Sequence, residues 1–343
     1  MIEPARNVTV LNGQNGQGKT NLLEGIFLFA GGRSFRTVHE SELVRFGEDF
    51  GEVSMVYESG GREMEVMLRF VPKTGKRFCR RNGVPLTKMS EMVGDFRAVL
   101  FCPEHLAIVR EGPSLRRRFL DTAISQVDPK YLRALQIYTH ALNQRNALIK
   151  MAKDRRNDGL FYQNAELFSE QMAEQGETIS KARQEYVERL DKTAGRFLSD
   201  MTAGRETMRL VYQTPRTKED YRRLLSENLD RELRAGATLY GVHKDDVAVF
   251  LNEKEARAYG SQGQQRSIAL SMKLAEGELS RESTKEYPVF LFDDILSELD
   301  ESRKSYLLSG LGDRQVLITS CEAVTAEGKI YQIKNGEVFH PVM

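Results

Sequence analysis

The sequence predicts an α/β protein whose nucleotide-binding head is split along the chain, with an antiparallel β patch and a helical lobe inserted between the two halves. Three observations predict this. A glycine-rich phosphate-loop pattern occupies residues 13–20, and an apolar strand that ends in two acids occupies residues 286–294. Between them the chain passes from strand-and-turn alternation to a long region in which apolar residues recur at helical spacing.

The first half of the predicted head is short. Residues 8–11 form an apolar run that predicts a buried strand, and residues 20–30 predict a helix that ends at Gly31 and Gly32. From about residue 52 to residue 90, apolar alternation is interrupted by SGG, PKTG and NG turn signals. This pattern predicts an antiparallel β patch inserted after the first helix.

Residues 114–235 change character, with few prolines, alternating charges and helical spacing that is clearest at 131–149. A pair of long antiparallel helices and a compact helical bundle both fit this region. After residue 240, strands are expected at 286–294 and 315–320, a helix at 301–311, and an NG hairpin at the end of the chain. We therefore predict a head of residues 1–104 plus 237–343 and a lobe of residues 105–236.

Composition excludes several classes of protein. The apolar runs are much shorter than the roughly 20 residues of a membrane span, and no secretory signal precedes residue 8. The three cysteines, Cys79, Cys102 and Cys321, form no CxxC pair, which argues against a zinc site or a disulfide framework. We expect a cytoplasmic protein with no membrane partner.

Charge is balanced, with 50 Lys plus Arg against 49 Asp plus Glu, so any nucleic-acid site must be a local patch. A solvated charged face is the commoner outcome for short basic runs and stays the alternative. The sequence offers two basic clusters: Lys73, Lys76, Arg77, Arg80 and Arg81 in one, and Arg116, Arg117 and Arg118 in the other.

The strongest motif is G-x-x-x-x-G-K-[ST] between a predicted strand and a predicted helix. Backbone amides of such a loop surround phosphates, the lysine reaches the β- and γ-phosphates, and the hydroxyl ligates Mg²⁺. A loop of this kind predicts a distant acid at the end of a buried strand, here Asp293 with Asp294 beside it. The predicted phosphate-binding residues are Gly13, Gln14, Asn15, Gly16, Gln17, Gly18, Lys19 and Thr20.

A second helix start occurs at residues 259–280, where Ser261 is a natural N-cap and exposed amides attract anions. Its candidate core positions are Ile268, Leu270, Leu274 and Leu279. A well-capped helix is the simple interpretation. The functional interpretation is a second phosphate-binding helix start, which makes sense if it serves the triphosphate of another copy of the chain.

The order of these motifs resembles that of ABC-type ATPases, and the signature SQGQQ resembles the RecF family of recombinational DNA repair proteins. The resemblance covers nearly the whole chain. Its motifs are NGQGKTNLLE (15–24), GRSFRT (32–37), LVRFG (43–47), GPSLRRRFLD (112–121), YGVHKDD (240–246), SQGQQRSIALSMKLAE (261–276) and FLFDDILSELD (290–300).

The resemblance implies an ABC-type P-loop ATPase head with a helical lobe, and ATP and Mg²⁺ as cofactors. It assigns phosphate binding to Gly13–Thr20, capping of the partner's γ-phosphate to Ser261, Gly263 and Gln264, and Mg²⁺ to Thr20 and Asp293. Lys19 and Asp294 are the implied catalytic residues. The implied partners are gapped or junction DNA at the nucleoid, a second copy in the presence of ATP, and RecO- and RecR-type proteins that help to load recombinase.

Three departures from the family pattern matter. Asp294 stands where many ABC ATPases place a catalytic Glu, and Thr319 and Ser320 stand where many place a switch His. A shorter acid positions the attacking water less well, so slow, DNA-stimulated hydrolysis is expected. The chain also lacks the opening strand that family members carry ahead of the strand at 8–11, which predicts an unpaired sheet edge and a lost nucleotide-binding Arg.

Other residues carry weaker hypotheses. We expect His243, Asp245 and Asp246 to form hydrogen bonds near the head interface, and one or two of Arg116–Arg118 to contact DNA or a partner. Arg33 and Arg36 follow the first helix and are candidates for a phosphate contact. The alternatives to a RecF-like protein are a short SMC-like ABC ATPase, a transporter nucleotide-binding subunit, and a non-hydrolysing scaffold for RecR-type partners.

Overall fold

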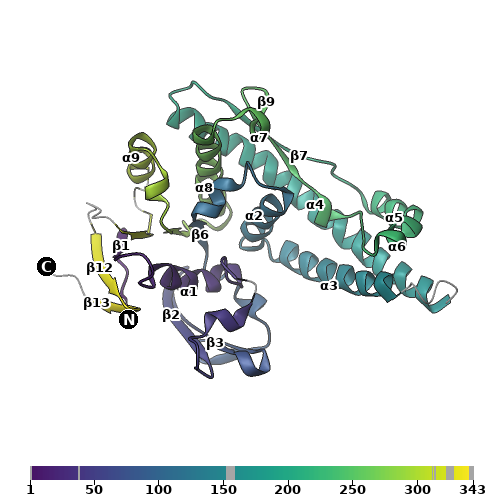
Figure 1. The fold of residues 1–343 in the computed structure, drawn as a ribbon, viewed down its shortest axis with the longest axis horizontal. Helices are drawn as coiled ribbons and strands as arrows, with labels where there is room; N and C mark the ends of the chain where they lie inside the picture. The colour runs from purple at the N-terminus through teal and green to yellow at the C-terminus, as the bar shows by residue number, and fades with distance from the viewer. Residues whose placement is uncertain are drawn as a thin grey trace. The chain divides into compact units, whose positions relative to one another are not determined.

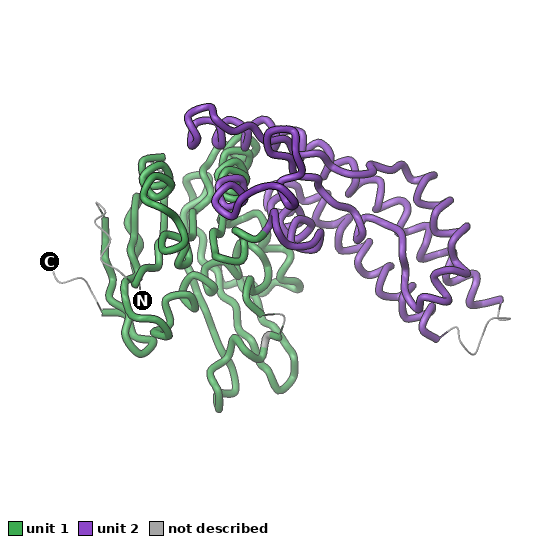
Figure 2. The backbone as a smooth tube through the Cα atoms, turned by 45° about the horizontal axis from the view of Figure 1, so that its top comes forward, with its two compact units in different colours: residues 1–107, 269–343 green, residues 108–268 purple. Residues whose placement is uncertain are grey.

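A computed structural model describes residues 2–37, 39–151, 159–310, 312, 314–321 and 328–339. The chain forms two compact units, residues 1–107 with 269–343 and residues 108–268, coloured separately in Figure 2. The domain division predicted from the sequence stays a prediction. The compact units differ from it in residues 237–268, because β8 (Val247–Leu251) in this segment pairs with β7 (Met208–Tyr212) of the second unit.

The first unit contains a six-stranded sheet in the order β13-β12-β1-β11-β10-β6 (Figure 1). Its strands are parallel except for the terminal hairpin of β12 and β13, which turns at Asn335 and Gly336 with positive φ angles of 52° and 76°. The strands are β1 (Val8–Asn12), β6 (Ala98–Phe101), β10 (Val289–Phe292), β11 (Val316–Ser320), β12 (Gly328–Lys334) and β13 (Glu337–Phe339).

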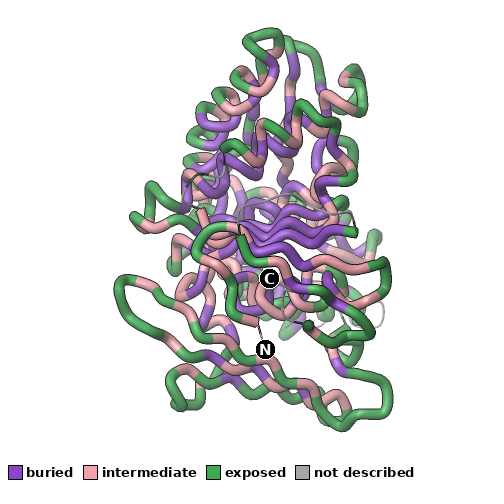
Figure 3. The backbone as a smooth tube through the Cα atoms, turned by 90° about the vertical axis from the view of Figure 1, so that its left-hand side faces the viewer, coloured by how far each residue is buried: buried purple, intermediate pink, exposed green. Residues whose placement is uncertain are grey.

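Burial follows the apolar runs of the sequence. Leu11, Leu291 and Leu317 on neighbouring central strands are at most 1% exposed, and Figure 3 shows the buried residues concentrated on these strands. Helices α1 (Lys19–Gly31) and α9 (Glu301–Ser309) belong to the same unit. Strands that are apolar along their whole length are typical of a parallel sheet covered by helices, so this part of the predicted α/β head is confirmed.

The predicted antiparallel patch is also confirmed. It is a four-stranded sheet of β2 (Gly51–Ser59), β3 (Arg62–Val71), β4 (Lys76–Arg81) and β5 (Val84–Leu86), in that order. Alternate residues of β3 enter the core while their neighbours face outward, as an antiparallel sheet with one solvated face requires. Within the described residues, β2 is an edge strand of this sheet.

The second unit is built on two long helices, α3 (Pro129–Met151) and α4 (Gly159–Met201), which pack against each other. Shorter helices α2 (Pro113–Ser125), α5 (Lys218–Glu227) and α6 (Leu229–Ala235) pack on this pair. Of the two arrangements that fit the sequence, the structure has the pair of long helices rather than a compact bundle. The two helices differ in length, because α4 is longer than α3. Strand β7 was not expected in a region predicted to be helical; it pairs with β8, which in turn pairs with β9 (Lys254–Glu255).

Two more helices follow in the chain, α7 (Ala256–Tyr259) and α8 (Gln262–Thr284), and the second begins at the predicted helix start. Short 3-10 helices occupy Glu40–Leu43, Pro72–Thr74, Met89–Met92, Pro103–Ala107, Val242–Lys244 and Leu296–Glu298. Among the helices of the described residues, none has an apolar stretch long enough to cross a membrane.

A buried ion pair joins α3 to α6 inside the second unit. Arg145 Nη1 lies 2.7 Å from Glu232 Oε2, and both side chains are 0% exposed. Arg145 also donates hydrogen bonds to the hydroxyls of Ser169 and Thr238, each at 2.9 Å. Losing one partner of such a pair leaves a buried charge without compensation, which is more costly than losing both.

We therefore expect Arg145→Met to lower the free energy of unfolding by about 3–5 kcal/mol, because Glu232 would keep its buried charge without a cation. The double variant Arg145→Met/Glu232→Leu should recover most of that loss. Urea unfolding followed by circular dichroism measures both. A single variant within about 1 kcal/mol of the parent would contradict this account of the lobe.

Candidate nucleotide-binding site

The phosphate-loop residues lie at the carboxyl edge of the six-stranded sheet, immediately after β1. The loop returns toward β11, because the Gly13 amide donates to the Ser320 carbonyl at 3.2 Å. Gly13 has no room for a side chain, since a Cβ atom there would lie 2.4 Å from the carbonyl oxygen of Ile333 on β12. Ligands of open parallel sheets bind at this edge, so the fold places the loop where a nucleotide is expected.

Two glycines shape the loop with positive φ angles, 76° at Gly16 and 98° at Gly18, a conformation that favours glycine. Gly18 is the N-cap of α1 and provides no side-chain cap for the first-turn amides. The terminal hairpin holds the loop from outside, because the amides of Gly336 and Asn335 donate to the carbonyl and side-chain oxygens of Gln17, at 3.0 and 2.6 Å. The start of α1 is therefore an anion-binding helix terminus on a fixed loop.

Lys19, the first residue of α1, directs its ammonium group back into the loop. Its Nζ donates to the carbonyl oxygens of Gly13 at 2.7 Å and Gln14 at 2.9 Å, and the residue is only 5% exposed. A positive charge is thus held beside the amides at the start of the helix. Together they form a compact site for a polyanion.

The structure brings Thr20 and Asp293 together from the two ends of the chain. Thr20 Oγ1 donates to Asp293 Oδ1 at 2.9 Å, and Thr319 Oγ1 donates to the same oxygen at 3.0 Å. Burial raises the pKa of Asp293 above its usual 3.8, although the hydrogen bonds from Thr20 and Thr319 oppose this shift. A hydroxyl and a carboxylate are oxygen ligands that suit Mg²⁺, which takes its remaining ligands from phosphate and water.

The described residues contain no group of three or more His, Cys, Asp or Glu side chains that could hold a metal ion by themselves. The Thr20 and Asp293 pair therefore fits a cation that arrives with a phosphate-bearing ligand. Asp294, next in sequence, has a φ of 52°, and its amide donates to Thr319 Oγ1 at 2.8 Å. Thr319 thus contacts both acids at the position where many ABC ATPases carry a switch His.

Cys321 is a site residue that the sequence reasoning missed. Its Sγ lies 2.8 Å from Asn15 Oδ1 and 3.6 Å from Lys19 Nζ, and the residue is exposed. Its position in the sequence, directly after β11, could have indicated this role. The carboxyl ends of β1, β10 and β11 meet at one edge of the sheet, so a residue that follows β11 lies near the loop that follows β1. The thiol belongs to the wall of the loop rather than to any disulfide or metal cluster.

The signature residues lie in the second unit and form a capping box at the start of α8. The Gln264 amide donates to Ser261 Oγ at 3.3 Å, and the Ser261 amide donates to Gln264 Oε1 at 2.9 Å. Gln264 Nε2 also donates to Glu206 Oε1 at 3.0 Å, a contact that sequence reasoning did not predict. Gly263 lies in the first turn of α8. The four predicted core positions of the helix are all buried, at 6% exposure or less: Ile268, Leu270, Leu274 and Leu279.

The consecutive arginines at 116–118 differ in exposure: Arg116 is buried, Arg117 is half-buried and Arg118 is exposed. Arg116 is 5% exposed, its Nε and Nη2 donate to Asp246 at 2.7 and 2.9 Å, and Nη1 donates to the carbonyls of Ile108 and Glu111. The expectation that one or two of these arginines contact DNA is therefore wrong for Arg116. Arg36, offered as a phosphate contact, pairs with Glu24 at 3.4 Å and stays half exposed.

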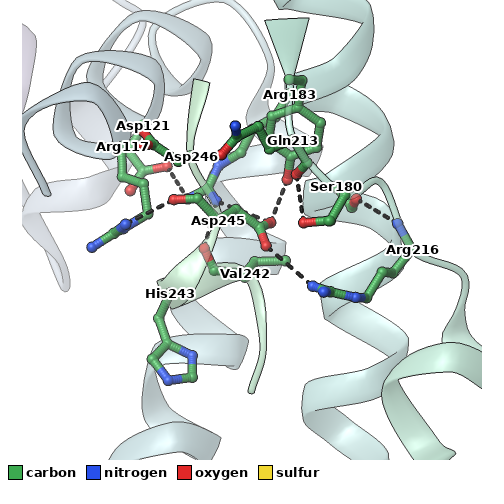
Figure 4. A network of polar contacts seen from close by, with 12 residues as sticks. Arg117, Asp121, Ser180, Arg183, Gln213, Arg216, Val242, His243, Asp245 and Asp246 are labelled. Atoms are coloured by element: carbon green, nitrogen blue, oxygen red, sulfur yellow. Dashed lines mark hydrogen bonds and ion pairs between the residues drawn. The ribbon is translucent and has the colours of Figure 1, made fainter. Parts of the chain in front are cut away.

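Val242, Asp245 and Asp246 take part in a polar network with the helices of the second unit (Figure 4). Arg183 on α4 donates to the Val242 carbonyl at 2.8 Å and to Asp121 on α2 at 2.7 Å. Asp245 accepts the Tyr212 hydroxyl, and its carbonyl accepts from Arg117 at 2.7 Å. The expected hydrogen-bonding role of this motif is confirmed, and the network ties α2, α4 and β7 to one short segment.

His243 takes part in the same segment but points away from Asp245 in Figure 4. Its Nδ1 lies 2.8 Å from the Tyr138 hydroxyl, and its Nε2 lies 3.2 Å from the Thr238 carbonyl. Burial lowers the pKa of His243 from 6.5 to about 4. The imidazole is therefore neutral in the folded protein at pH 7.

Comparison with known proteins agrees with the geometry of the loop and sheet. The family model described as RecF/RecN/SMC N terminal domain matches residues 1–335, which defines the class as the ATPase heads that RecF, RecN and SMC proteins share. A solved SMC head from Pyrococcus furiosus, 19% identical, has the same fold with a TM-score of 0.55 over 98% of this chain and 90% of that one.

Proteins with higher sequence identity to this chain identify its family within this class. The DNA replication and repair protein RecF of Ligilactobacillus salivarius is 37% identical, over 96% of this chain and 91% of that protein. The RecF protein of Staphylococcus carnosus is also 37% identical, over 97% and 93%. A structure of the recombination mediator protein RecF with ATP, in the RecFOR pathway, superposes with a TM-score of 0.91 at 34% identity, over 99% and 93%. This chain belongs to the RecF family.

The buried histidine predicts a pH dependence. Because the folded pKa of about 4 lies below the ordinary 6.5, the unfolded chain binds a proton first as the pH falls. Protonation of His243 in the unfolded chain has no effect on the free energy of unfolding above pH 6.5. Between pH 6.5 and pH 4 it lowers that free energy progressively, by about 2 kcal/mol at pH 5. Urea unfolding at pH 7.5 and pH 5 should show a smaller difference for His243→Asn than for the parent. Equal differences would contradict it.

Proposed function

We propose that this chain is an ATP-dependent DNA-binding protein of recombinational repair and replication-fork recovery. It binds ATP with Mg²⁺ at the loop Gly13–Thr20 and engages DNA where single and double strands meet. With RecO- and RecR-type partners it helps to load recombinase. Support comes from relatives named for DNA replication and repair, from the ATP-bound RecF of the RecFOR pathway, and from the contact between Thr20 and Asp293.

That contact carries the most weight. A phosphate loop alone is compatible with many activities, but Thr20 at the start of α1 and Asp293 directly after β10 meet at 2.9 Å although they lie 273 residues apart in the sequence. In this proposal Thr20 and Asp293 would hold Mg²⁺ when ATP is bound, and Lys19 would neutralise phosphate charge. The ion, when bound, supplies charge stabilisation to the transferring phosphoryl group.

The signature residues Ser261, Gly263 and Gln264 serve the nucleotide of a second copy in this proposal. Their helix start offers amides to an anion, and Ser261 is exposed. Two copies would then enclose two ATP molecules, and ATP binding would drive dimerisation. The chain would act as a clamp on DNA that opens when ATP is hydrolysed.

Asp294 is the proposed group that orients the attacking water. As an aspartate it is one methylene shorter than glutamate, and in-line attack depends on close positioning. Hydrolysis should therefore be slow and should act as a timer.

Lys19→Ala tests the nucleotide site. It should weaken ATP binding about ten- to a hundredfold, because hydrogen bonds to a charged group contribute about 1.5–3 kcal/mol. It should also abolish the dimer that forms with ATP and Mg²⁺ on gapped duplex, measured by light scattering after size exclusion. Lys181→Ala, an exposed lysine on α4, is the matched control. A Lys19→Ala protein that still dimerises and loads recombinase would identify a scaffold instead of an ATP switch.

The timer role predicts slow turnover without DNA and faster turnover with gapped duplex. Steady-state phosphate release by the purified protein, with and without DNA, measures both. A turnover on the order of tens per second in the absence of DNA would place this chain among ordinary ATPases and contradict the proposed role of Asp294.

A further inference from the structure

The outer face of the four-stranded sheet is unusually rich in exposed aromatic and cationic side chains. The inner face is filled by Val66, Leu68 and Phe70, which are at most 5% exposed. The alternate residues therefore face away from the core. Among them Phe78 on β4 is 50% exposed, and Phe50, just before β2, is also 50% exposed.

Arg69 lies between these two phenylalanines in the order of the strands. Arg69 on β3 is directly opposite Phe78 on β4 in the strand register. The Arg69 guanidinium carbon also lies 4.8 Å from the centre of the Phe50 ring. Glu52 holds that guanidinium in place, with Nη2 to Oε2 at 2.6 Å and Nε to Oε2 at 2.8 Å. The result is a row of ring, guanidinium and ring across the face, which we call the aromatic row.

Cations extend the aromatic row along β4. Lys76 and Arg80 stand two residues to either side of Phe78, so they share its face, and both are exposed. Residues two apart on a strand are separated by about 6.8 Å, so the Cα atoms of Lys76 and Arg80 lie about 14 Å apart, with Phe78 midway between them. Arg77 and Arg81 point the other way, where Arg77 meets Met89 Sδ and Arg81 pairs with Asp95. Only alternate members of the basic cluster are therefore available to a ligand on this face.

Acidic residues lie at the opposite end of the same sheet. Glu58 and Glu63 are paired across β2 and β3 near their connecting turn, and Glu65 follows on β3. All three are exposed. A polyanion would be repelled from that end and attracted to the end with Lys76, Arg80 and the aromatic row. The face is thus polarised along its strands.

We propose that the aromatic row with Lys76 and Arg80 binds an unpaired DNA strand. Exposed rings offer stacking surfaces to bases that are not paired, and flanking cations neutralise the phosphates between them. A duplex hides its base faces, so it would use the cations but not the rings. The inference rests on the proposed function only in taking DNA as the ligand, and it assigns the single-stranded side of a junction to this sheet.

The test measures fluorescence anisotropy of labelled oligothymidylate and of a blunt duplex with the full chain, ATP and Mg²⁺, over a range of salt concentrations. Phe78→Leu keeps apolar surface but removes the ring. It should weaken oligothymidylate binding about fivefold or more without changing the salt dependence, and should leave the duplex affinity unchanged. Tyr162→Leu, which removes a ring on α4 that is 45% exposed, is the matched control and should bind as the parent does.

Arg80→Ala and Lys76→Ala should each lower the slope of log affinity against log salt by about 0.7 for the single strand. Arg62→Ala, an exposed arginine beside the acidic end, should leave the slope unchanged. Phe78→Trp should bind at least as tightly as the parent, which separates stacking from any effect of Phe78→Leu on folding.

Three outcomes would each contradict a different part of the proposal. A parent chain that binds neither DNA overturns the proposed function itself. A parent that binds while Phe78→Leu and Tyr162→Leu behave alike overturns the aromatic row alone. Equal weakening of oligothymidylate and duplex by Phe78→Leu would mean that the ring contacts no unpaired base.

Discussion

The central sheet depends on joining the two ends of the chain, and the hydrogen bond from Thr20 to Asp293 spans 273 residues of sequence as a consequence. Strand β1 is inserted between β11 and β12, so the first strand is held on both sides by the last part of the chain. The register pairs Asn12 with Ser320, which brings the carboxyl ends of β1 and β11 level. Every residue of the candidate nucleotide site in the first unit takes its position from this pairing.

This constraint places the phosphate loop where several parts of the first unit can hold it, although the loop has little regular structure. Gly13 is held against β12 and β11, Gln17 is held by the terminal hairpin, and Lys19 returns to the loop carbonyls. A polyanion meets preorganised amides and a fixed cation, so little ordering remains for the binding step. The terminal hairpin, which looks like a simple end to the fold, is thus part of the support of the site.

The second unit shows why the net charge of the chain is a poor guide to nucleic-acid binding. Three arginines, Arg116, Arg145 and Arg183, are at most 5% exposed and each pairs with an acid. Their charges are therefore neutralised inside the unit. Counting basic residues therefore says little about nucleic-acid binding in this chain. The position of each basic residue is informative instead, because β-strand alternation places Lys76 and Arg80 on one face of the sheet and Arg77 and Arg81 on the other.

Much of the fold could be predicted because its signals are local. The loop glycines, the apolar strands and the NG hairpin each carry their own short pattern, and Asp293 follows directly from the strand before it. Strand β7, the burial of Arg116 and the site contacts of Cys321 and Glu206 could not be predicted in this way. Each depends on a partner far along the chain, such as β8 for β7 or Asp246 for Arg116, and a single sequence does not specify such pairs.

The most direct test of the account is whether one active site is shared between two copies of the chain. Lys19→Ala and Ser261→Arg proteins, each inactive alone, would be mixed in equal amounts and assayed for DNA-stimulated ATP hydrolysis. A shared site predicts that the mixture recovers activity that neither protein shows alone, because a mixed dimer holds one intact site of two. A mixture as inactive as its components would contradict the shared site.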